Sequence, residues 1–132
     1  MSKVGSRIAV VKHYIEELWN KKNDAIQGDL CRYKPDSRGG IFRKSFPDCV
    51  LKIDRQFEHD DIVVTQYTVT GTHTRSYMGV KPTKKRVSFS ATFMHRVVDG
   101  KIVERWGASD GLGVLQQIGG LPEQMAKAHA AS

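Results

Sequence analysis

The chain has 132 residues, of which 39% are hydrophobic and 27% charged, and these values are typical of one globular domain spanning residues 1–132. No apolar run is long enough to cross a membrane and the N-terminal residues lack a secretory pattern, so we expect a cytoplasmic protein with no membrane partner. The formal net charge of +7 leaves both anionic small molecules and nucleic acid open as partners.

The first predicted element is a helix over residues 7–22. Apolar side chains recur there at helical spacing, and Ser6 precedes them in the position of an N-cap. Residues 23–40 are rich in turn formers and predict irregular structure. A short helix is expected at residues 41–46, ended by Pro47.

Cys31 and Cys49 are the only cysteines. They lie far apart, without a CxxC pair and without histidines at metal-ligand spacing. A disulfide framework or a structural zinc site is therefore not expected, and both thiols are predicted to be reduced. The prediction is a protein with no metal and no cofactor.

From residue 49 onward, β-branched and aromatic residues alternate with polar ones, which is typical of β-strands. Four strands are predicted, over residues 49–57, 62–74, 86–98 and 101–109. The segment 58–61 turns between the first two, and Asp99 and Gly100 form a two-residue hairpin turn between the last two.

The sequence "GLGVLQQIGG" predicts a short closing helix that paired glycines stop, and residues 124–132 predict a mobile tail. Helices followed by a run of antiparallel strands indicate an α+β domain with helices against one face of a bent sheet.

The loop before the third strand is strongly basic, with the run "KPTKKR" at residues 81–86. Phosphate contacts through Lys81, Lys84, Lys85 and Arg86 would suit nucleic acid. No aromatic stacking pattern accompanies the charge, so a solvated loop is the favoured interpretation and nucleic acid the least favoured partner.

The two-residue hairpin sets a register for the last two strands. The predicted pairs are Val97 with Ile102, His95 with Glu104, Phe93 with Trp106, Ala91 with Ala108, and Phe89 with Asp110. Period-two alternation places all of these residues on one face, whose composition marks it as buried. A β-bulge would change the assignment beyond it, which affects the end of the strand most.

Three ionisable residues share this predicted inner face, where an unpaired charge is costly. His95 and Glu104 face each other, so a structural pair that fixes the register is favoured. Asp110 has no partner in this register, and two roles are open for it. It is an N-cap for the closing helix, or a carboxylate that takes part in chemistry.

The strand at residues 62–74 alternates in the same way. Its predicted inner residues are Val63, Thr65, Tyr67, Val69, Gly71 and His73. His73 lies at the strand end beside the basic loop, where a structural role is favoured, although its pKa would also suit an acid or a hydrogen-bond donor near neutral pH.

Several segments together resemble the SnoaL-like polyketide cyclase (ester cyclase) family of the nuclear-transport-factor-2-like superfamily. They are "VKHYIEELWNKKN", "FPDCVLKI" and most of the chain from "VTGTHT" to "VLQQIG". The most specific parts are "GTHT", "MGVKPT", "RVVDGKIVERW" and the aspartate four residues after that tryptophan. The resemblance implies a cone-shaped α+β barrel, with a curved antiparallel sheet wrapped around N-terminal helices and a deep apolar pocket.

Characterised cyclases of this family close a ring of an aromatic polyketide by intramolecular aldol condensation, without metal or cofactor. The resemblance implies that Asp110 is the acid/base, and a carboxyl group among Phe89 and Trp106 would have a pKa raised toward neutrality. It also implies that His73 and Tyr14 are polar residues of the pocket. A homodimer is common in the superfamily and is expected by resemblance alone.

The sequence departs from the family pattern in two ways. The segment at residues 23–46 is shorter than in the family, where it carries polar pocket residues. Arg75 and Lys84 replace two family glycines, which makes the rim of the pocket more basic.

The leading hypothesis is therefore a cofactor-free cyclase- or isomerase-like enzyme for an apolar, carbonyl-bearing small molecule, with Asp110 as general acid/base and His73 orienting a substrate oxygen. The residues predicted to bind the substrate are Tyr14, Tyr67, Phe89, Phe93, His95, Glu104 and Trp106. The alternative is a non-catalytic module of the same fold that binds small molecules or dimerises, which the short segment at residues 24–45 favours.

Overall fold

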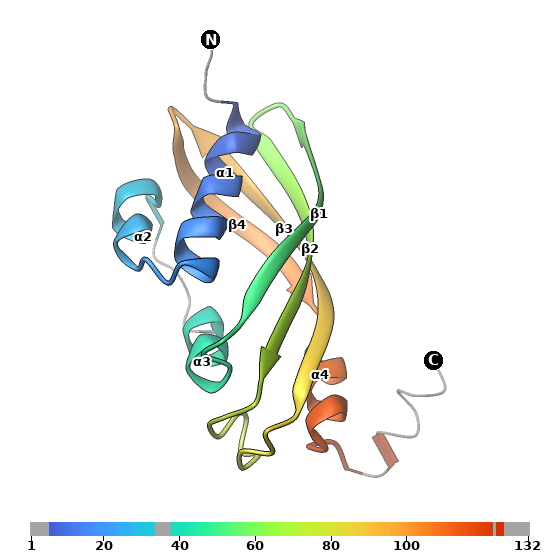
Figure 1. Cartoon of the computed structure of the whole chain (residues 1–132). Helices are drawn as coiled ribbons and strands as arrows, with labels where there is room; N and C mark the ends of the chain where they lie inside the picture. The colour runs from blue at the N-terminus through green and yellow to red at the C-terminus, as the bar shows by residue number, and fades with distance from the viewer. Residues whose placement is uncertain (1–5, 34–37, 123, 126–132) are drawn as a thin grey trace.

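The computed structural model describes residues 6–33, 38–122 and 124–125, and it has the α+β fold predicted from the sequence (Figure 1). The elements are α1 (Arg7–Ile15), the π-helix η1 (Glu16–Asn20), α2 (Ala25–Leu30), α3 (Arg38–Ser45), β1 (Val50–His59), β2 (Ile62–Thr72), β3 (Arg86–Val98), β4 (Lys101–Ser109) and α4 (Gly111–Ile118). The predicted tail at residues 124–132 lies mostly outside the described residues. Within the described ranges, no helix has both the length and the apolarity needed to cross a bilayer.

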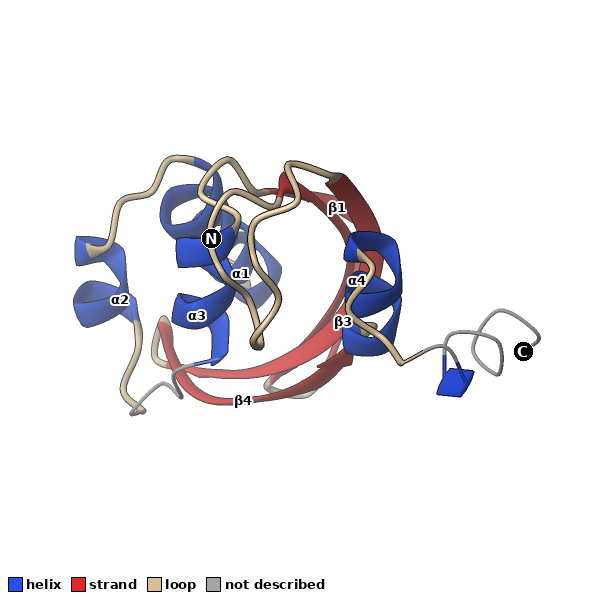
Figure 2. Ribbon diagram, turned by 90° about the horizontal axis from the view of Figure 1, so that it is seen from below, coloured by secondary structure: helices blue, strands red, loops and turns tan. Residues whose placement is uncertain are grey.

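The four strands form one antiparallel sheet in the order β1-β2-β3-β4. The sheet curves, and α1 lies against its concave face in contact with all four strands (Figure 2). Asp99 and Gly100 have φ values of 51° and 74° between β3 and β4, which confirms the predicted two-residue turn. On β2 every second residue is buried, so the predicted inner face is also confirmed.

The predicted first helix divides into two parts. Ser6 caps α1, since its hydroxyl accepts a hydrogen bond from the Ala9 N–H at 3.1 Å. From Glu16 the backbone continues as the π-helix η1. At its end, the Asn20 amide donates to the Leu51 carbonyl at 3.0 Å and accepts from the Leu51 N–H at 2.8 Å. The side chain thus pairs with the edge strand β1 as a neighbouring strand would.

The pairing of β3 with β4 corrects the predicted register. Val97 lies opposite Ile102 as predicted, but Arg96 lies opposite Glu104, so Val103 is an extra residue in β4. This is a β-bulge, and every side chain of β4 beyond it changes face. Four predicted pairs are wrong, namely His95 with Glu104, Phe93 with Trp106, Ala91 with Ala108, and Phe89 with Asp110.

Glu104 and Trp106 therefore lie on the outer face of the sheet. Glu104 accepts a hydrogen bond from the Arg96 guanidinium at 2.7 Å, and that guanidinium also contacts Asp61 at 2.6 Å. Arg96 lies 5.5 Å from the ring centroid of Trp106. The Arg96 guanidinium thus pairs with the Glu104 carboxylate and covers the Trp106 indole on the outer face of the sheet.

The inner face of β4 instead receives Arg105, Gly107 and Ser109. They lie opposite His95, Phe93 and Ala91 in that order. The bulge therefore places a guanidinium, rather than a carboxylate, inside the curve of the sheet.

Candidate functional site

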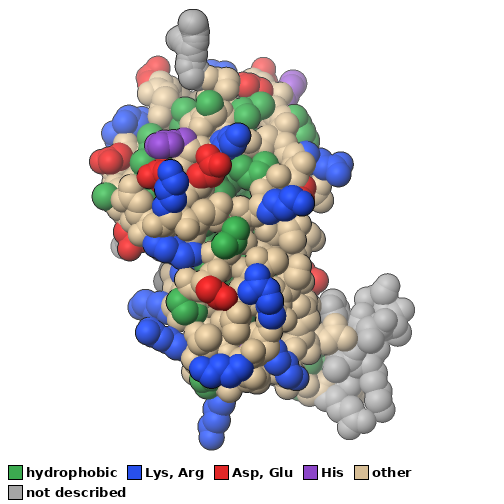
Figure 3. Space-filling model, viewed as in Figure 1, with side chains coloured by type: hydrophobic (Ala, Val, Ile, Leu, Met, Phe, Trp, Pro, Cys, Tyr) green, Lys and Arg blue, Asp and Glu red, His purple; other side chains and the backbone are tan. Residues whose placement is uncertain are grey.

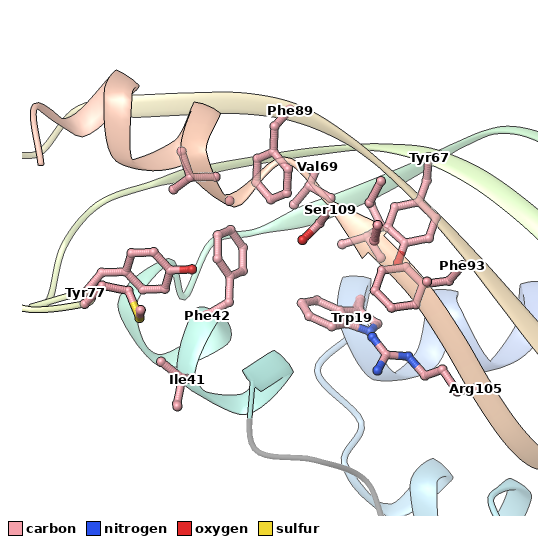
Figure 4. Close-up of a pocket in the computed structure, with 17 residues that line it drawn as sticks. Trp19, Ile41, Phe42, Tyr67, Val69, Tyr77, Phe89, Phe93, Arg105 and Ser109 are labelled. Atoms are coloured by element: carbon pink, nitrogen blue, oxygen red, sulfur yellow. The ribbon is translucent and has the colours of Figure 1, made fainter. Parts of the chain in front are cut away.

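A cavity of about 470 Å³ lies between the inner face of the sheet and η1, α3 and α4 (Figure 4). Sites for small molecules usually have volumes of roughly 300–1,000 Å³. The lining is mainly apolar, and its aromatic members are Trp19, Phe42, Tyr67, Tyr77, Phe89 and Phe93. The size and the aromatic walls suit a flat organic molecule.

The short segment before β1 supplies one wall of this pocket. Phe42 on α3 stacks on Phe46 with 4.4 Å between ring centroids. It makes edge-to-face contacts with Phe89 and Tyr77, whose ring centroids lie 5.4 Å and 5.9 Å from its own. Ile41, one residue earlier, also lines the cavity. The helix α3 therefore provides an aromatic wall of the pocket.

Of the lining residues, all within the described part of the chain, only Arg105 carries a formal charge. Its guanidinium carbon lies 4.0 Å from the ring centroid of Phe93, which in turn stacks on Tyr67 with centroids 5.9 Å apart. Burial raises the pKa of Tyr67, although the charge of Arg105 and its hydrogen bond act in the opposite direction. No acidic side chain among the described residues forms a salt bridge with Arg105.

A polar cluster borders Arg105 outside the lining. Burial is the main cause that raises the pKa of Tyr14, Cys31 and Tyr33, and in each case the nearby charge of Arg105 lowers it in smaller measure. The Gln27 amide donates to the Tyr14 hydroxyl at 3.4 Å. All three groups are therefore neutral near pH 7, and none of them balances the guanidinium charge. Tyr14, predicted as a pocket residue, lies in this cluster.

His95 is buried beside the same guanidinium. Burial lowers its pKa to about 3, and the charge of Arg105 contributes in the same direction. Its ring meets Tyr14 edge-on with centroids 6.0 Å apart, and its Nδ1 has no hydrogen-bond partner among the described residues. His95 is thus a neutral side chain behind the pocket, without the predicted partner Glu104 and without a place in the lining.

Asp110 is the N-cap of α4, as one of its two predicted roles requires. Its Oδ1 accepts a hydrogen bond from the Gly113 N–H at 2.9 Å. A Cβ atom at residue 113 would collide with this carboxylate, so the glycine leaves the space that the cap occupies. Ser109 and Gly111 line the pocket on either side, while Asp110 itself is not in the lining.

His73 anchors the basic loop from the interior. Its side chain is fully buried and stacks on Phe46 with centroids 5.4 Å apart. Its Nδ1 accepts a hydrogen bond from the Thr83 N–H at 3.2 Å and lies 3.0 Å from the Thr83 hydroxyl. The backbones of His73 and Lys85 are also joined, with the His73 N–H donating at 2.9 Å. The histidine lies outside the pocket lining.

The structure therefore brings together only part of the predicted set. Tyr67, Phe89 and Phe93 line the cavity, whereas six predicted residues lie outside it, namely Tyr14, His73, His95, Glu104, Trp106 and Asp110. Four lining residues do not follow from the sequence pattern, namely Trp19, Phe42, Tyr77 and Arg105. The three aromatic residues are apolar positions in the sequence and so carry a signal of burial. Arg105 carries none, because the β-bulge in β4 changes the face on which its side chain lies. In the described residues, no three His, Cys, Asp or Glu side chains gather as metal ligands would.

The model of the SnoaL-like polyketide cyclase family matches residues 40–118, more than half of the chain, and the chain belongs to this family. The curved sheet and its helices have the nuclear-transport-factor-2-like fold of the solved relatives. AclR from Streptomyces galilaeus, a candidate hydroxylase, is 28% identical, with 88% of this chain and 97% of that chain covered and a TM-score of 0.73.

Two further solved structures share the fold. IdmH from Streptomyces antibioticus, a candidate polyketide cyclase, is 24% identical, with 87% of this chain and 99% of that chain covered and a TM-score of 0.74. TsrD from Streptomyces laurentii is 21% identical, with 85% and 93% covered and a TM-score of 0.74. No curated protein matches the sequence significantly.

Proposed function

We propose that this protein is a cofactor-free enzyme of the cyclase or isomerase type, which binds an apolar, carbonyl-bearing small molecule in the pocket and moves a proton with Asp110. The observation that supports this most is the position of Asp110, which is fixed as the cap of α4 and lies in the sequence between Ser109 and Gly111, two residues that line the aromatic-walled cavity. Membership of a polyketide cyclase family supports the same reaction type.

The cap gives the two oxygens of Asp110 different roles. Oδ1 is held by the Gly113 N–H, and Oδ2 has no hydrogen-bond partner among the described residues. In the proposed step Oδ2 removes a proton from the carbon next to a substrate carbonyl, and the enolate carbon bonds to a second carbonyl carbon. The new alkoxide takes the proton back from the Asp110 carboxyl, so the reaction is an isomerisation that needs no oxidant or reductant.

An exchange assay tests the proton transfer without knowledge of the natural substrate. Polycyclic aromatic ketones that stabilise the protein and carry a hydrogen on a saturated carbon next to the carbonyl are incubated with it in D₂O, and deuterium uptake at that carbon is measured. Asparagine caps helices about as well as aspartate but cannot take the proton, so Asp110→Asn should melt like wild type and bind the same ketones without catalysing exchange. Exchange at the wild-type rate in this variant would refute the proposal.

The second candidate is a non-catalytic binding module of the same fold. The observation that favours it is that the Asp110 carboxylate is engaged as a cap and both buried histidines lie outside the lining. It predicts ligand binding that survives Asp110→Asn, together with no exchange in wild type for any bound ketone.

The homodimer expected from the resemblance remains a proposal for the outer face of the sheet. This face exposes Met94 and Trp106, with 39% and 36% of their surfaces accessible. Sedimentation equilibrium should give twice the mass of one chain in wild type and the monomer mass in Trp106→Glu; a monomeric wild type would exclude it.

A further inference from the structure

We infer that the ligand of this pocket is an apolar acid, and that its carboxylate pairs with Arg105. The inference takes from the proposed function only the placement of a small molecule in the pocket. It holds whether or not Asp110 moves a proton, and it adds the substrate class that the proposed function leaves open.

The first argument is the unbalanced charge of Arg105. The guanidinium carbon lies over the Phe93 ring at 4.0 Å from its centroid, and no acidic side chain in the described ranges forms a salt bridge with the guanidinium. Arg105 is half-buried, and an ion that has lost part of its hydration is stabilised by a partner of opposite charge. A planar carboxylate fits the edge of a guanidinium through two parallel hydrogen bonds, which makes it the matching ligand group.

The neighbours of Arg105 do not compensate this charge. Tyr14, Cys31, Tyr33 and Tyr67 contribute hydroxyl and thiol groups, and burial raises the pKa of each of them, so they stay neutral. Arg96, the other arginine stacked on an aromatic ring of this hairpin, shows the contrast. It contacts both Asp61 and Glu104. The outer-face guanidinium has its carboxylates within the protein, whereas the pocket guanidinium is left for a ligand.

The second argument is the charge around the opposite end of the pocket. Figure 4 shows Arg105 at one end of the cavity and Ile41 and Tyr77 at the other. Thr74 on the loop after β2 donates from its N–H to the Ser45 carbonyl at 3.0 Å, so the end of α3 and this loop are joined.

The exposed basic side chains of this region are Lys44, Arg75, Lys81, Lys84, Lys85 and Arg86, of which Arg86 forms a salt bridge with Asp48 at 3.5 Å. Lys and Arg gather on this lower part of the molecule in Figure 3. A cluster of one sign attracts anions and raises their association rate, an effect that falls with added salt. The surface thus favours the approach of an acid, and the guanidinium inside the cavity would hold it.

The shape of the lining defines the rest of the ligand. Phe93, Phe89 and Phe42 line the cavity between Arg105 and Tyr77, and they offer ring faces and edges rather than hydrogen-bond donors. A flat polycyclic carboxylic acid therefore matches both the aromatic walls and the single charge.

The test is a titration with three compounds that differ in one group: an anthraquinone carboxylate, its methyl ester and its carboxamide. We expect wild type to bind the acid about ten- to a hundredfold more tightly than the ester, which is the range for hydrogen bonds to a charged group. Arg105→Met should remove this preference while it keeps affinity for the ester. Arg96→Met is the matched control, because it removes a stacked guanidinium from the outer face and should leave the preference unchanged.

Equal affinities of acid and ester for wild type, or binding of none of the three, would overturn the inference. So would a preference that survives Arg105→Met, or one that follows Lys81, Lys84 and Lys85 when these are changed to Ser. If Arg105→Met does not fold, Arg105→Lys tests the same point, since a lysine keeps the charge but loses the paired hydrogen bonds and should retain a weakened preference. Asp110→Asn must retain the full preference for the acid, which separates this inference from the proposed proton transfer.

Discussion

Replacing His95 with leucine should make the protein markedly more resistant to mild acid. His95 is buried opposite Arg105 of β4 and edge-on to Tyr14 of α1, so a proton on its ring would place a second positive charge beside the guanidinium. Burial and this neighbour lower its pKa from 6.5 to about 3 in the folded protein. Between these two pH values the unfolded chain binds more protons than the folded one, and the free energy of unfolding therefore falls as the pH falls.

The size of the effect follows from the same two pKa values. Each pH unit below 6.5 costs about 1.4 kcal/mol until the folded pKa is approached, so the wild type should lose about 3 kcal/mol at pH 4.5 through His95 alone. The His95→Leu variant lacks this loss. At pH 7.5 it should be as stable as wild type or slightly more so, because Nδ1 of the histidine has no partner among the described residues.

Urea unfolding at pH 7.5 and pH 4.5 measures this difference directly. Losses from carboxylate groups occur in both proteins and cancel in the comparison. His59→Leu is the control, since the His59 side chain is 88% exposed and its replacement should not change the acid loss. If wild type and His95→Leu lose the same stability between the two pH values, the buried, neutral state of His95 is refuted.

Three further predictions concern two backbone positions and one helix cap. Gly107 has a φ of 157° and a Cβ there would collide with the Thr92 carbonyl oxygen, so Gly107→Ala should cost at least about 2 kcal/mol in urea unfolding. A cost below about 0.5 kcal/mol would contradict this close approach. Lys84 has a φ of 62° whereas Lys85 has no positive φ, so Lys84→Gly should be about 1 kcal/mol more stable than Lys85→Gly by thermal unfolding. Equal melting of these two would argue against the left-handed backbone at Lys84. Asp110→Ala should cost about 1 kcal/mol and Asp110→Asn only a few tenths, and equal losses in both would remove the capping role.

Much of the fold follows from local sequence patterns, namely turn residues, strand alternation and helix caps. Asp99-Gly100 fixes the hairpin because both residues adopt positive φ readily, and the alternation on β2 places Tyr67 correctly in the pocket. The cap at Asp110 follows from an aspartate directly before the closing helix. These features depend on a few neighbouring residues, so one sequence is sufficient to predict them.

The site depends on features that have no such local signal. The bulge at Val103 adds one residue to β4, and the sequence does not show which of the two alternating sets of β4 side chains faces inward. Trp106 gives the set on the outer face the stronger apolar character. The indole is tolerated outside because Arg96 covers it, a contact across strands that periodicity does not reveal. The same β-bulge places Arg105 in the lining of the pocket. Helical spacing likewise predicts an ordinary helix at Trp19, which lies in the π-helix η1.

The most direct test of the pocket uses the two tryptophans of the chain, which lie on opposite faces of the sheet. Trp19 lines the cavity and Trp106 lies on the outer face. Fluorine NMR of fluorotryptophan-labelled protein, with Trp19→Phe and Trp106→Phe to assign the two signals, should show the Trp19 resonance moving as an anthraquinone carboxylate is added, while the Trp106 resonance stays in place. Movement of Trp106 alone, or of neither signal at saturating acid, would contradict the assignment of this cavity as the functional site.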